Sequence, residues 1–160
     1  MKNLILIILS IILSLNIQAQ KKTKLSKYTF GDVKAREIGP AVMSGRVSTI
    51  DAVNSDHNII YVGAASGGVW KSTNGGNSFK AVFDKQIQSI GTINIDQQHP
   101  DTVWVGTGEV WVRNSTSIGN GIYKTTNGGE KWKNMGLEAT ERIAKIVIDS
   151  KDANTLYVAA

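Results

Sequence analysis

Apolar and polar positions alternate in short blocks along most of the chain, and the same order of blocks recurs. Three stretches align without gaps on Tyr61, Trp104 and Tyr157: RVSTIDAVNSDHNIIYVG, SIGTINIDQQHPDTVWVG and RIAKIVIDSKDANTLYVA. In each stretch, two runs rich in β-branched residues flank a polar segment of turn-forming residues. The pattern predicts two strands joined by a turn in each of the three stretches.

A second block repeats independently of the first. It reads GVWKSTNGGNSF from Gly68 and GIYKTTNGGEKW from Gly121, with an Asn-Gly pair and a returning aromatic residue in each copy. Because Asn and Gly both tolerate positive φ, the pair predicts a tight hairpin. The first copy is therefore predicted to contain four antiparallel strands, near residues 47–53, 59–65, 68–72 and 79–83.

The period of the repeat predicts the fold class. The aligned aromatic residues lie 43 and 53 positions apart, close to the roughly 40 to 50 residues of one propeller blade. We therefore predict an all-β protein, a β-propeller of four-stranded antiparallel blades. The expected bounds are 39–84 for blade 1, 85–136 for blade 2 and 137–160 for the start of blade 3.

Two and a half blades are fewer than the roughly 4 to 8 that close a ring. We expect the chain to be an N-terminal fragment, completed by the remaining blades of a longer protein, because it stops inside a strand and would leave an open edge. The alternative is that several short chains assemble into one ring.

The N-terminus has the pattern of a signal peptide over residues 1–19. A cation at Lys2 precedes an apolar run from Leu4 to Leu15, and the small residue Ala19 precedes a polar segment. The apolar run is shorter than the roughly 20 residues that a transmembrane helix needs. We therefore expect an exported protein, periplasmic, cell-surface or secreted, with no permanent membrane span.

Charge and cysteine content narrow the possible partners. The formal net charge is +5, but the excess of cations lies in a basic leader, residues 20–38, which we expect to be solvated. From Glu37 onward the chain is close to neutral, so the sequence predicts no nucleic-acid partner. The absence of cysteine excludes disulfides and thiolate metal sites.

The two Asn-Gly blocks resemble the Asp-box, or BNR repeat, Ser/Thr-x-Asp-x-Gly-x-x-Trp. Both copies have Asn where that family usually has Asp, and the first copy has Phe in place of Trp. Asn keeps the side-chain oxygen that bonds backbone N–H groups in a turn, so these positions are expected to be structural. The matched residues are Ser72, Asn74, Gly76, Phe79, Thr125, Asn127, Gly129 and Trp132.

The longer stretch from Gly39 to Ala160 resembles exported bacterial proteins of the sortilin N-terminal-domain or BNR-repeat glycosyl hydrolase-like type. In the related xyloglucanase-type enzymes, the resemblance places a catalytic carboxylate just before a Gly-Gly pair that follows the second strand of blade 1. Here that position is Ala65, within YVGAASGGVW. Alanine cannot transfer a proton, so the catalytic residues of this chain are unknown.

The two complete repeats differ in one loop. Five positions separate Gly63 from Gly68, whereas fifteen separate the equivalent Gly106 and Gly121. In an up-and-down blade this loop shares one end of the sheets, here called the insertion rim, with the connections between blades. Loops on a rigid scaffold often carry binding residues. The candidate ligand-binding residues on this rim are Glu109, Trp111, Arg113, Asn114, Arg46 and Arg142.

Two interpretations of this loop remain open. In the first, Trp111 offers an apolar face to a sugar or a peptide, while Glu109 and Arg113 supply polar contacts. In the second, the loop extends a strand pair, with Val110 and Val112 packed inward and Glu109 paired with Arg113.

The remaining polar residues suggest no further chemistry. His57 and His99 lie in separate turns without a third ligand, so the sequence predicts no metal site and no cofactor. Asp96 and Asp149 occupy equivalent positions and are interpreted as caps at strand ends.

The sequence thus favours an exported Asp-box propeller that binds extracellular glycans or polypeptides. One alternative is a glycoside hydrolase whose catalytic carboxylates lie partly outside the chain, and if the protein is an enzyme, this is the class expected. The other is a structural scaffold for assembly or adhesion.

Overall fold

The computed structural model describes residues 45–111, 114 and 116–160. The chain divides into two units, Met1–Glu37 and Ile38–Ala160, and every described residue belongs to the second unit. The predicted signal peptide, the basic leader and the candidate residue Arg113 lie outside the described residues.

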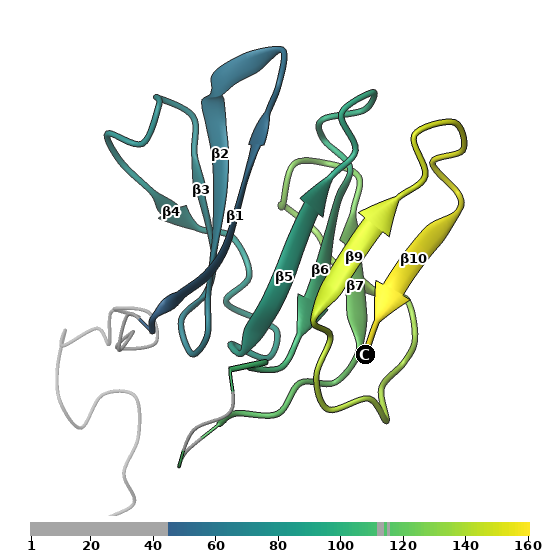
Figure 1. Ribbon diagram of the computed structural model, residues 1–160. Coiled ribbons are helices and arrows are strands. Elements are labelled where there is room, and N and C mark those ends of the chain that lie inside the picture. Colours follow the sequence, from purple (N-terminus) through teal and green to yellow (C-terminus); the bar gives the residue numbers. More distant parts are fainter. Residues whose placement is uncertain (1–44, 112–113, 115) are drawn as a thin grey trace, which may run out of the picture. The chain divides into compact units, whose positions relative to one another are not determined.

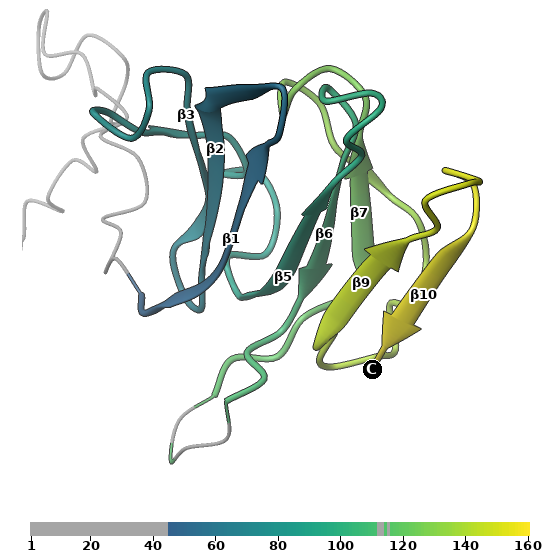
Figure 2. The same ribbon diagram turned by 45° about the horizontal axis from the view of Figure 1, so that its top comes forward.

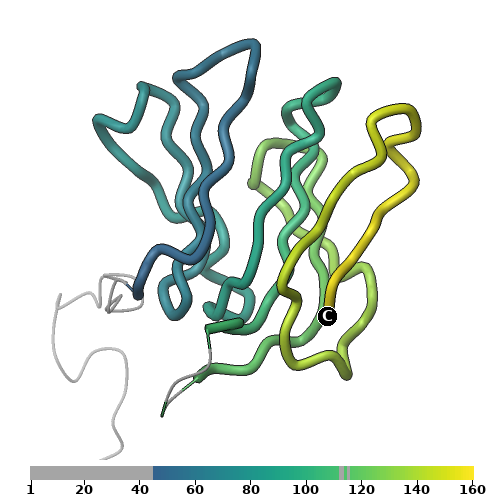
Figure 3. The backbone as a smooth tube through the Cα atoms, in the orientation of Figure 1, coloured from purple at the N-terminus to yellow at the C-terminus, as the bar shows by residue number. Residues whose placement is uncertain are grey.

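Regular structure in the described residues consists of β-strands arranged in three antiparallel sheets (Figure 1). The strand orders are β1-β2-β3-β4, β5-β6-β7-β8 and β9-β10. Within each sheet the chain runs back and forth between neighbouring strands (Figure 3). The strands are β1 (Val47–Val53), β2 (Asp56–Ala64), β3 (Gly68–Ser72), β4 (Lys80–Ala81), β5 (Ile90–Ile95), β6 (Val103–Thr107), β7 (Ile122–Thr125), β8 (Lys133–Asn134), β9 (Lys145–Ile148) and β10 (Leu156–Ala159).

The strand bounds of the first sheet differ from the prediction in two strands, β2 and β4. β2 begins at Asp56, before the predicted residue 59, because Asp56 pairs with Val53 and leaves a two-residue turn. β4 is confined to Lys80–Ala81, instead of residues 79–83. Phe83 leaves the strand because its fully buried ring packs edge-on against Tyr123 of the second sheet, with 5.2 Å between ring centroids.

The three sheets repeat the same strand register. Tyr61 lies opposite Asp51, and Tyr157 lies opposite Val147. Trp104 of the second sheet pairs with Asn94 in the same way. The three aromatic residues therefore occupy equivalent places in successive sheets.

Burial of these aromatic residues depends on the sheet that follows. Tyr61 is fully buried beneath the second sheet and Trp104 is 6% exposed beneath the third, whereas Tyr157 is 61% exposed. Burial, and then the nearby Asp101 carboxylate, raise the pKa of Tyr61 to about 12. The phenol therefore stays protonated and donates a hydrogen bond of 3.1 Å to the Gly128 carbonyl of the second sheet.

On the opposite face of the sheets, the side chain of the first sheet is exposed and those of the second and third sheets are buried. Ile50 of the first sheet is 63% exposed, whereas the equivalent Ile93 and Ile146 are buried by the sheet that precedes each of them. Each sheet thus has two apolar faces, and each face must be covered by a neighbouring sheet.

Neighbouring sheets interlock through glycines. Ile90 packs over Gly63 of the first sheet, and Ile143 packs over Gly106 at the equivalent place in the second. A Cβ atom at either glycine would overlap the isoleucine side chain. The close approach of the sheets therefore requires glycine at these two positions.

The turn between β3 and β4 is built around one hydroxyl and one amide oxygen. Ser72 Oγ donates to Asn74 Oδ1 over 3.0 Å and accepts the N–H of Gly76 over 2.9 Å. Asn74 Oδ1 also accepts the N–H of Ser78 over 3.0 Å.

The turn between β7 and β8 has the same hydrogen bonds. Thr125 Oγ1 donates to Asn127 Oδ1 over 2.8 Å and accepts the Gly129 N–H over 3.1 Å, while Asn127 Oδ1 accepts the Lys131 N–H over 3.0 Å.

The prediction of a tight Asn-Gly hairpin is wrong about which residues have positive φ. The positive φ values fall on the glycine pairs, 68° at Gly75 and 86° at Gly76 in the first turn, and not on the asparagines. The asparagine keeps an ordinary backbone because its side-chain oxygen is needed to bond N–H groups further along the turn.

Replacing Gly106 with alanine should destabilise the fold by about 1–3 kcal/mol, because the added methyl group overlaps Ile143 and the sheets must separate to accept it. The midpoint of urea unfolding measures the change. Ser55→Ala, at an exposed turn position, is the control and should shift the free energy of unfolding by less than about 0.5 kcal/mol. Equal midpoints for the two variants would contradict the packing described here.

Asn127→Ala should lower the free energy of unfolding by about 1–2 kcal/mol, since the Thr125 hydroxyl and the Lys131 N–H lose their acceptor. Asn127→Asp retains a side-chain oxygen at the same place and should stay within about 0.5 kcal/mol of the parent. Thermal unfolding of the pair measures the difference. Equal losses would show that the amide oxygen does not stabilise the turn.

Candidate functional site

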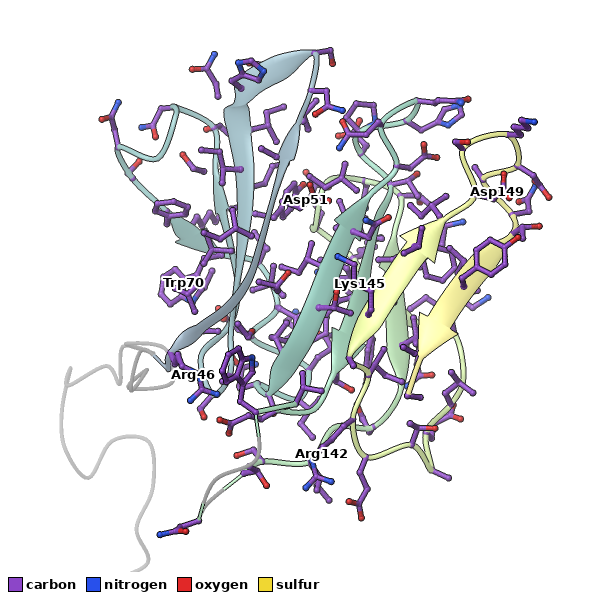
Figure 4. The ribbon with its side chains drawn as sticks, viewed as in Figure 1. Arg46, Asp51, Trp70, Arg142, Lys145 and Asp149 are labelled. Carbon is purple, nitrogen blue, oxygen red and sulfur yellow. The ribbon has the colours of Figure 1, made fainter. Side chains whose placement is uncertain are left out.

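The insertion rim carries the long loop between β6 and β7 together with the starts of β1 and β9. Figure 4 shows Arg46 and Arg142 at this end of the sheets, with Asp149 at the opposite end. Figure 2 shows the described parts of the loop between β6 and β7 extending beyond the ends of these strands. The sheets thus bring two candidate arginines and the loop to the same end of the molecule.

Glu109 lies in the loop after β6, and Arg46 lies just before β1 in the neighbouring sheet. Arg46 Nη2 donates to Glu109 Oε1 over 2.6 Å. The glutamate side chain is 1% exposed, whereas that of Arg46 is 41% exposed. The ion pair therefore ties the loop of the second sheet to the first, with the carboxylate buried and the guanidinium partly in solvent.

Main-chain hydrogen bonds hold the base of the loop on both sides. The Glu109 N–H donates to the Ser117 carbonyl over 2.9 Å, which brings the two arms of the loop together. Gly108 donates to the Ser89 carbonyl over 2.8 Å, and Gly119 donates to the Glu141 carbonyl over 2.7 Å. Both partners lie in the connections between sheets, so the base of the loop has a fixed position.

Arg142 contacts the same loop from the third sheet. Its Nη2 donates to Thr116 Oγ1 over 3.2 Å, and its Nη1 lies 3.1 Å from Glu141 Oε2. The structure therefore brings Arg46 and Arg142 to opposite sides of one loop.

The outer part of the loop is exposed. Trp111 is 70% exposed, and Asn114 is also exposed. The other arm borders a hollow of about 470 Å³, which is lined by Ser66, Ile87, Gln88, Ser89, Thr116, Ser117 and Ile118. The described part of the loop therefore presents one large exposed aromatic side chain on its first arm and a hollow along its second arm.

Ala65 lies at the first-sheet side of this rim. It is 1% exposed, and its N–H donates to the Arg46 carbonyl over 2.9 Å. The position that the family resemblance assigns to an acid is therefore a buried methyl group beside Arg46.

The turns at the other end of the sheets are structural. Asp96 accepts the backbone N–H groups of Gln98 and His99, at 3.0 and 3.3 Å. Burial raises the pKa of Asp96, but these hydrogen bonds and the His99 ring outweigh it and leave the pKa below its usual value. Asp149 accepts the N–H of Lys151 in the equivalent turn.

The two histidines belong to different sheets, His57 to β2 and His99 to the turn between β5 and β6. His57 is exposed, and His99 Nδ1 lies 3.1 Å from Asp96 Oδ2. Among the residues that the structure describes, no three His, Asp or Glu side chains gather closely enough to hold a metal ion. The same residues contain no helix long and apolar enough to cross a membrane.

Sequence reasoning missed two contacts that connect sheets. The Arg46–Glu109 pair joins residues 63 positions apart in different loops, and nothing in the pattern signals it. Lys71 Nζ donates to the Gly128 carbonyl over 3.0 Å. The sequence indicates a role for this lysine, because the aligned blocks GVWKST and GIYKTT both have lysine at the same position.

Arg46→Met should lower the free energy of unfolding by about 2–3 kcal/mol, because it removes a positive charge from a buried carboxylate. Glu109→Gln should cost less than about 1 kcal/mol, since the partly exposed guanidinium that remains can be hydrated. Chemical denaturation of the two variants tests this asymmetry. Greater destabilisation by Glu109→Gln would contradict it.

The amino-acid sequence resembles that of a known enzyme over part of its length. No family model matches the chain. The chain is 32% identical over 115 residues to a xyloglucanase of Hypocrea jecorina (strain QM6a), a match that covers 58% of this chain and 13% of that protein.

Two solved structures have a similar fold. An ancestral GH74 enzyme gives a TM-score of 0.56 at 25% identity, covering 71% of this chain and 16% of the enzyme. The GH74 enzyme of Niastella koreensis gives a TM-score of 0.55 at 24% identity, and the match covers 69% of this chain and 16% of the enzyme. The chain thus spans less than one fifth of each protein that it matches. The predicted all-β propeller is confirmed, and its architecture is that of a glycoside hydrolase-like propeller.

Proposed function

We propose that this chain belongs to an exported β-propeller protein that binds extracellular glycans on the insertion rim. The observation that carries the proposal is the 70% exposure of Trp111 on a loop whose base is hydrogen-bonded to both neighbouring connections. An exposed indole on a fixed support offers a flat apolar face to the C–H face of a pyranose ring.

The surroundings of Trp111 support a polar, extended ligand. Arg46 is partly exposed beside the loop, and Arg142 lies on its other side. The wall of the hollow of about 470 Å³ contains Ile87 and Ile118 together with serine, threonine and glutamine side chains. A mainly apolar wall with a few polar groups suits a small ligand, and these polar groups suit the hydroxyl groups of a sugar. Glu109 has a supporting role in this arrangement, since it holds Arg46 in place.

Three further observations support an exported, glycan-directed protein. The matched relative is a xyloglucanase. Residues 1–19 have the pattern of a signal peptide. The two turns with identical hydrogen bonds fit an Asp-box in which asparagine replaces aspartate.

The similarity to a xyloglucanase and to GH74 enzymes favours glycoside hydrolysis as a second candidate. That reaction needs two carboxyl groups on either side of the scissile bond. Position 65 supplies a buried methyl group, and Glu109 is buried against Arg46. Catalysis would therefore depend on carboxylates other than these, and binding is the function that the described residues support best.

Trp111→Ala should weaken the affinity of the full chain for a xyloglucan oligosaccharide by at least about tenfold, because the apolar stacking surface is lost. Isothermal titration calorimetry measures the change. His57→Ala removes an exposed ring at the opposite end of the sheets and should leave the affinity unchanged. Unchanged binding by the Trp111 variant would refute the rim site. Release of reducing ends from xyloglucan would favour the hydrolase instead.

A further inference from the structure

Charge is distributed in the same way in both complete sheets. The segments holding the first two strands, 47–67 and 90–107, each contain two aspartates and no lysine or arginine. The segments holding the last two strands, 68–88 and 121–136, each contain three lysines and one acid. The outer half of each sheet is therefore basic, although the repeat region as a whole is close to neutral.

The lysines of the outer strands form like-charge pairs. Lys71 of β3 lies directly opposite Lys80 of β4, and Lys124 of β7 lies opposite Lys133 of β8. Like charges directly across an antiparallel pair destabilise a sheet. Within the described part of the chain, none of the four has a carboxylate within 4.0 Å. The same unfavourable pairing thus occurs in both described sheets without a direct ion pair to either lysine.

Packing explains the inner lysine of each pair. Lys71 Nζ lies 5.3 Å from the centre of the Tyr61 ring and also donates to the Gly128 carbonyl. Lys124 Nζ lies 4.8 Å from the centre of the Trp104 ring. These contacts stabilise the inner cations. The outer lysines, Lys80 and Lys133, are exposed, and the fold does not require their charge.

A cleft joins the basic surfaces of the two sheets. It has a volume of about 640 Å³, and Lys80, Lys85 and Lys131 line it together with the acids Asp84 and Glu130. A smaller hollow of about 250 Å³ continues along the second sheet and is lined by Lys124, Lys131 and Lys133 among others. Because Lys131 borders both, the cations form a band that runs from the outer strands of one sheet to those of the next.

The aromatic residue in this cleft is not a stacking platform. Trp132 Nε1 donates to the Val82 carbonyl over 2.7 Å and to the Gly129 carbonyl over 3.1 Å. The Trp132 ring packs edge-on against Phe83, with 5.0 Å between centroids. Single-stranded nucleic acids need aromatic faces for their bases, so the cleft suits a ligand recognised by its charges alone.

We infer that the outer strands of successive sheets form a second binding surface, separate from the insertion rim, for a linear acidic polysaccharide. Repetition of the lysine pair from sheet to sheet matches a polymer with regularly spaced anionic groups, carboxylate or sulfate. Lysine provides compact point charges with rotatable donors, which bind such groups without a fixed orientation. The inference depends on the proposed function only in taking the partner to be a glycan.

The test compares two charge-removing variants of the full chain. Lys80→Gln with Lys133→Gln removes the exposed lysine of each pair. Lys145→Gln with Lys151→Gln removes two exposed lysines of the third sheet and its turn, and serves as the control with the same net charge. The probes are polygalacturonate, which carries only carboxylates, and dextran sulfate, which carries only sulfates.

The affinity for one or both acidic probes should fall at least about tenfold in the Lys80/Lys133 variant and less than about twofold in the control. The probe that loses affinity identifies the anionic group. Raising the ionic strength should weaken binding by the parent chain, because these exposed charges are screened. The Lys80/Lys133 variant should unfold at the same or a higher temperature than the parent, since repulsion is relieved.

Equal losses in both variants, or no binding of either acidic probe by the parent chain, would overturn the inference. Equally tight binding of a single-stranded oligonucleotide of the same charge would do so as well, because the surface would then not be selective for a polysaccharide. The Lys80/Lys133 variant should keep its affinity for the neutral xyloglucan oligosaccharide. Failure of the outer surface and failure of the rim site can therefore be told apart.

Discussion

The structure depends on sheets that cover one another face to face. Each four-stranded sheet is apolar on both sides, and neither side is buried by the sheet's own residues. The same register position is buried in the first sheet at Tyr61 and exposed in the third at Tyr157, and the difference is the presence of a following sheet. An apolar face in this fold is thus buried only where a neighbouring sheet covers it. The hydrophobic effect therefore stabilises each sheet only through its contact with the next.

Close contact between sheets imposes requirements on particular residues. Gly63 and Gly106 leave space for isoleucines of the next sheet. The aromatic residues reach across the interface to main-chain groups: Tyr61 donates to the Gly128 carbonyl, and Trp132 donates to the Val82 carbonyl. Polar groups are therefore satisfied between sheets as well as within them, which fixes the relative position of adjacent sheets.

A scaffold fixed in this way allows variation at its ends and its outer edge. The segment from Gly106 to Gly121 is ten residues longer than the equivalent segment from Gly63 to Gly68, yet the base of its loop is hydrogen-bonded to connections on both sides. The outer strands and the residues beside them contact the neighbouring sheet through Lys71, Tyr123 and Trp132. Lys80 and Lys133 are exposed, so these two lysines are free to serve recognition. The insertion rim and the outer edge of the sheets are thus two surfaces that one fold supports independently.

The sequence by itself determined the four-strand repeat and its period, because alternating apolar residues and repeated turn residues are local signals. The start of β2 and the extent of β4 followed instead from pairing and packing. The sequence also located the long loop and Ala65. Tertiary structure decided which side chains meet. Glu109 finds Arg46 in another sheet, and the Asn74 side chain, not its backbone, shapes its turn. Such pairings depend on the angle and spacing between sheets. Packing sets both quantities, and they do not appear as a periodic pattern in the sequence.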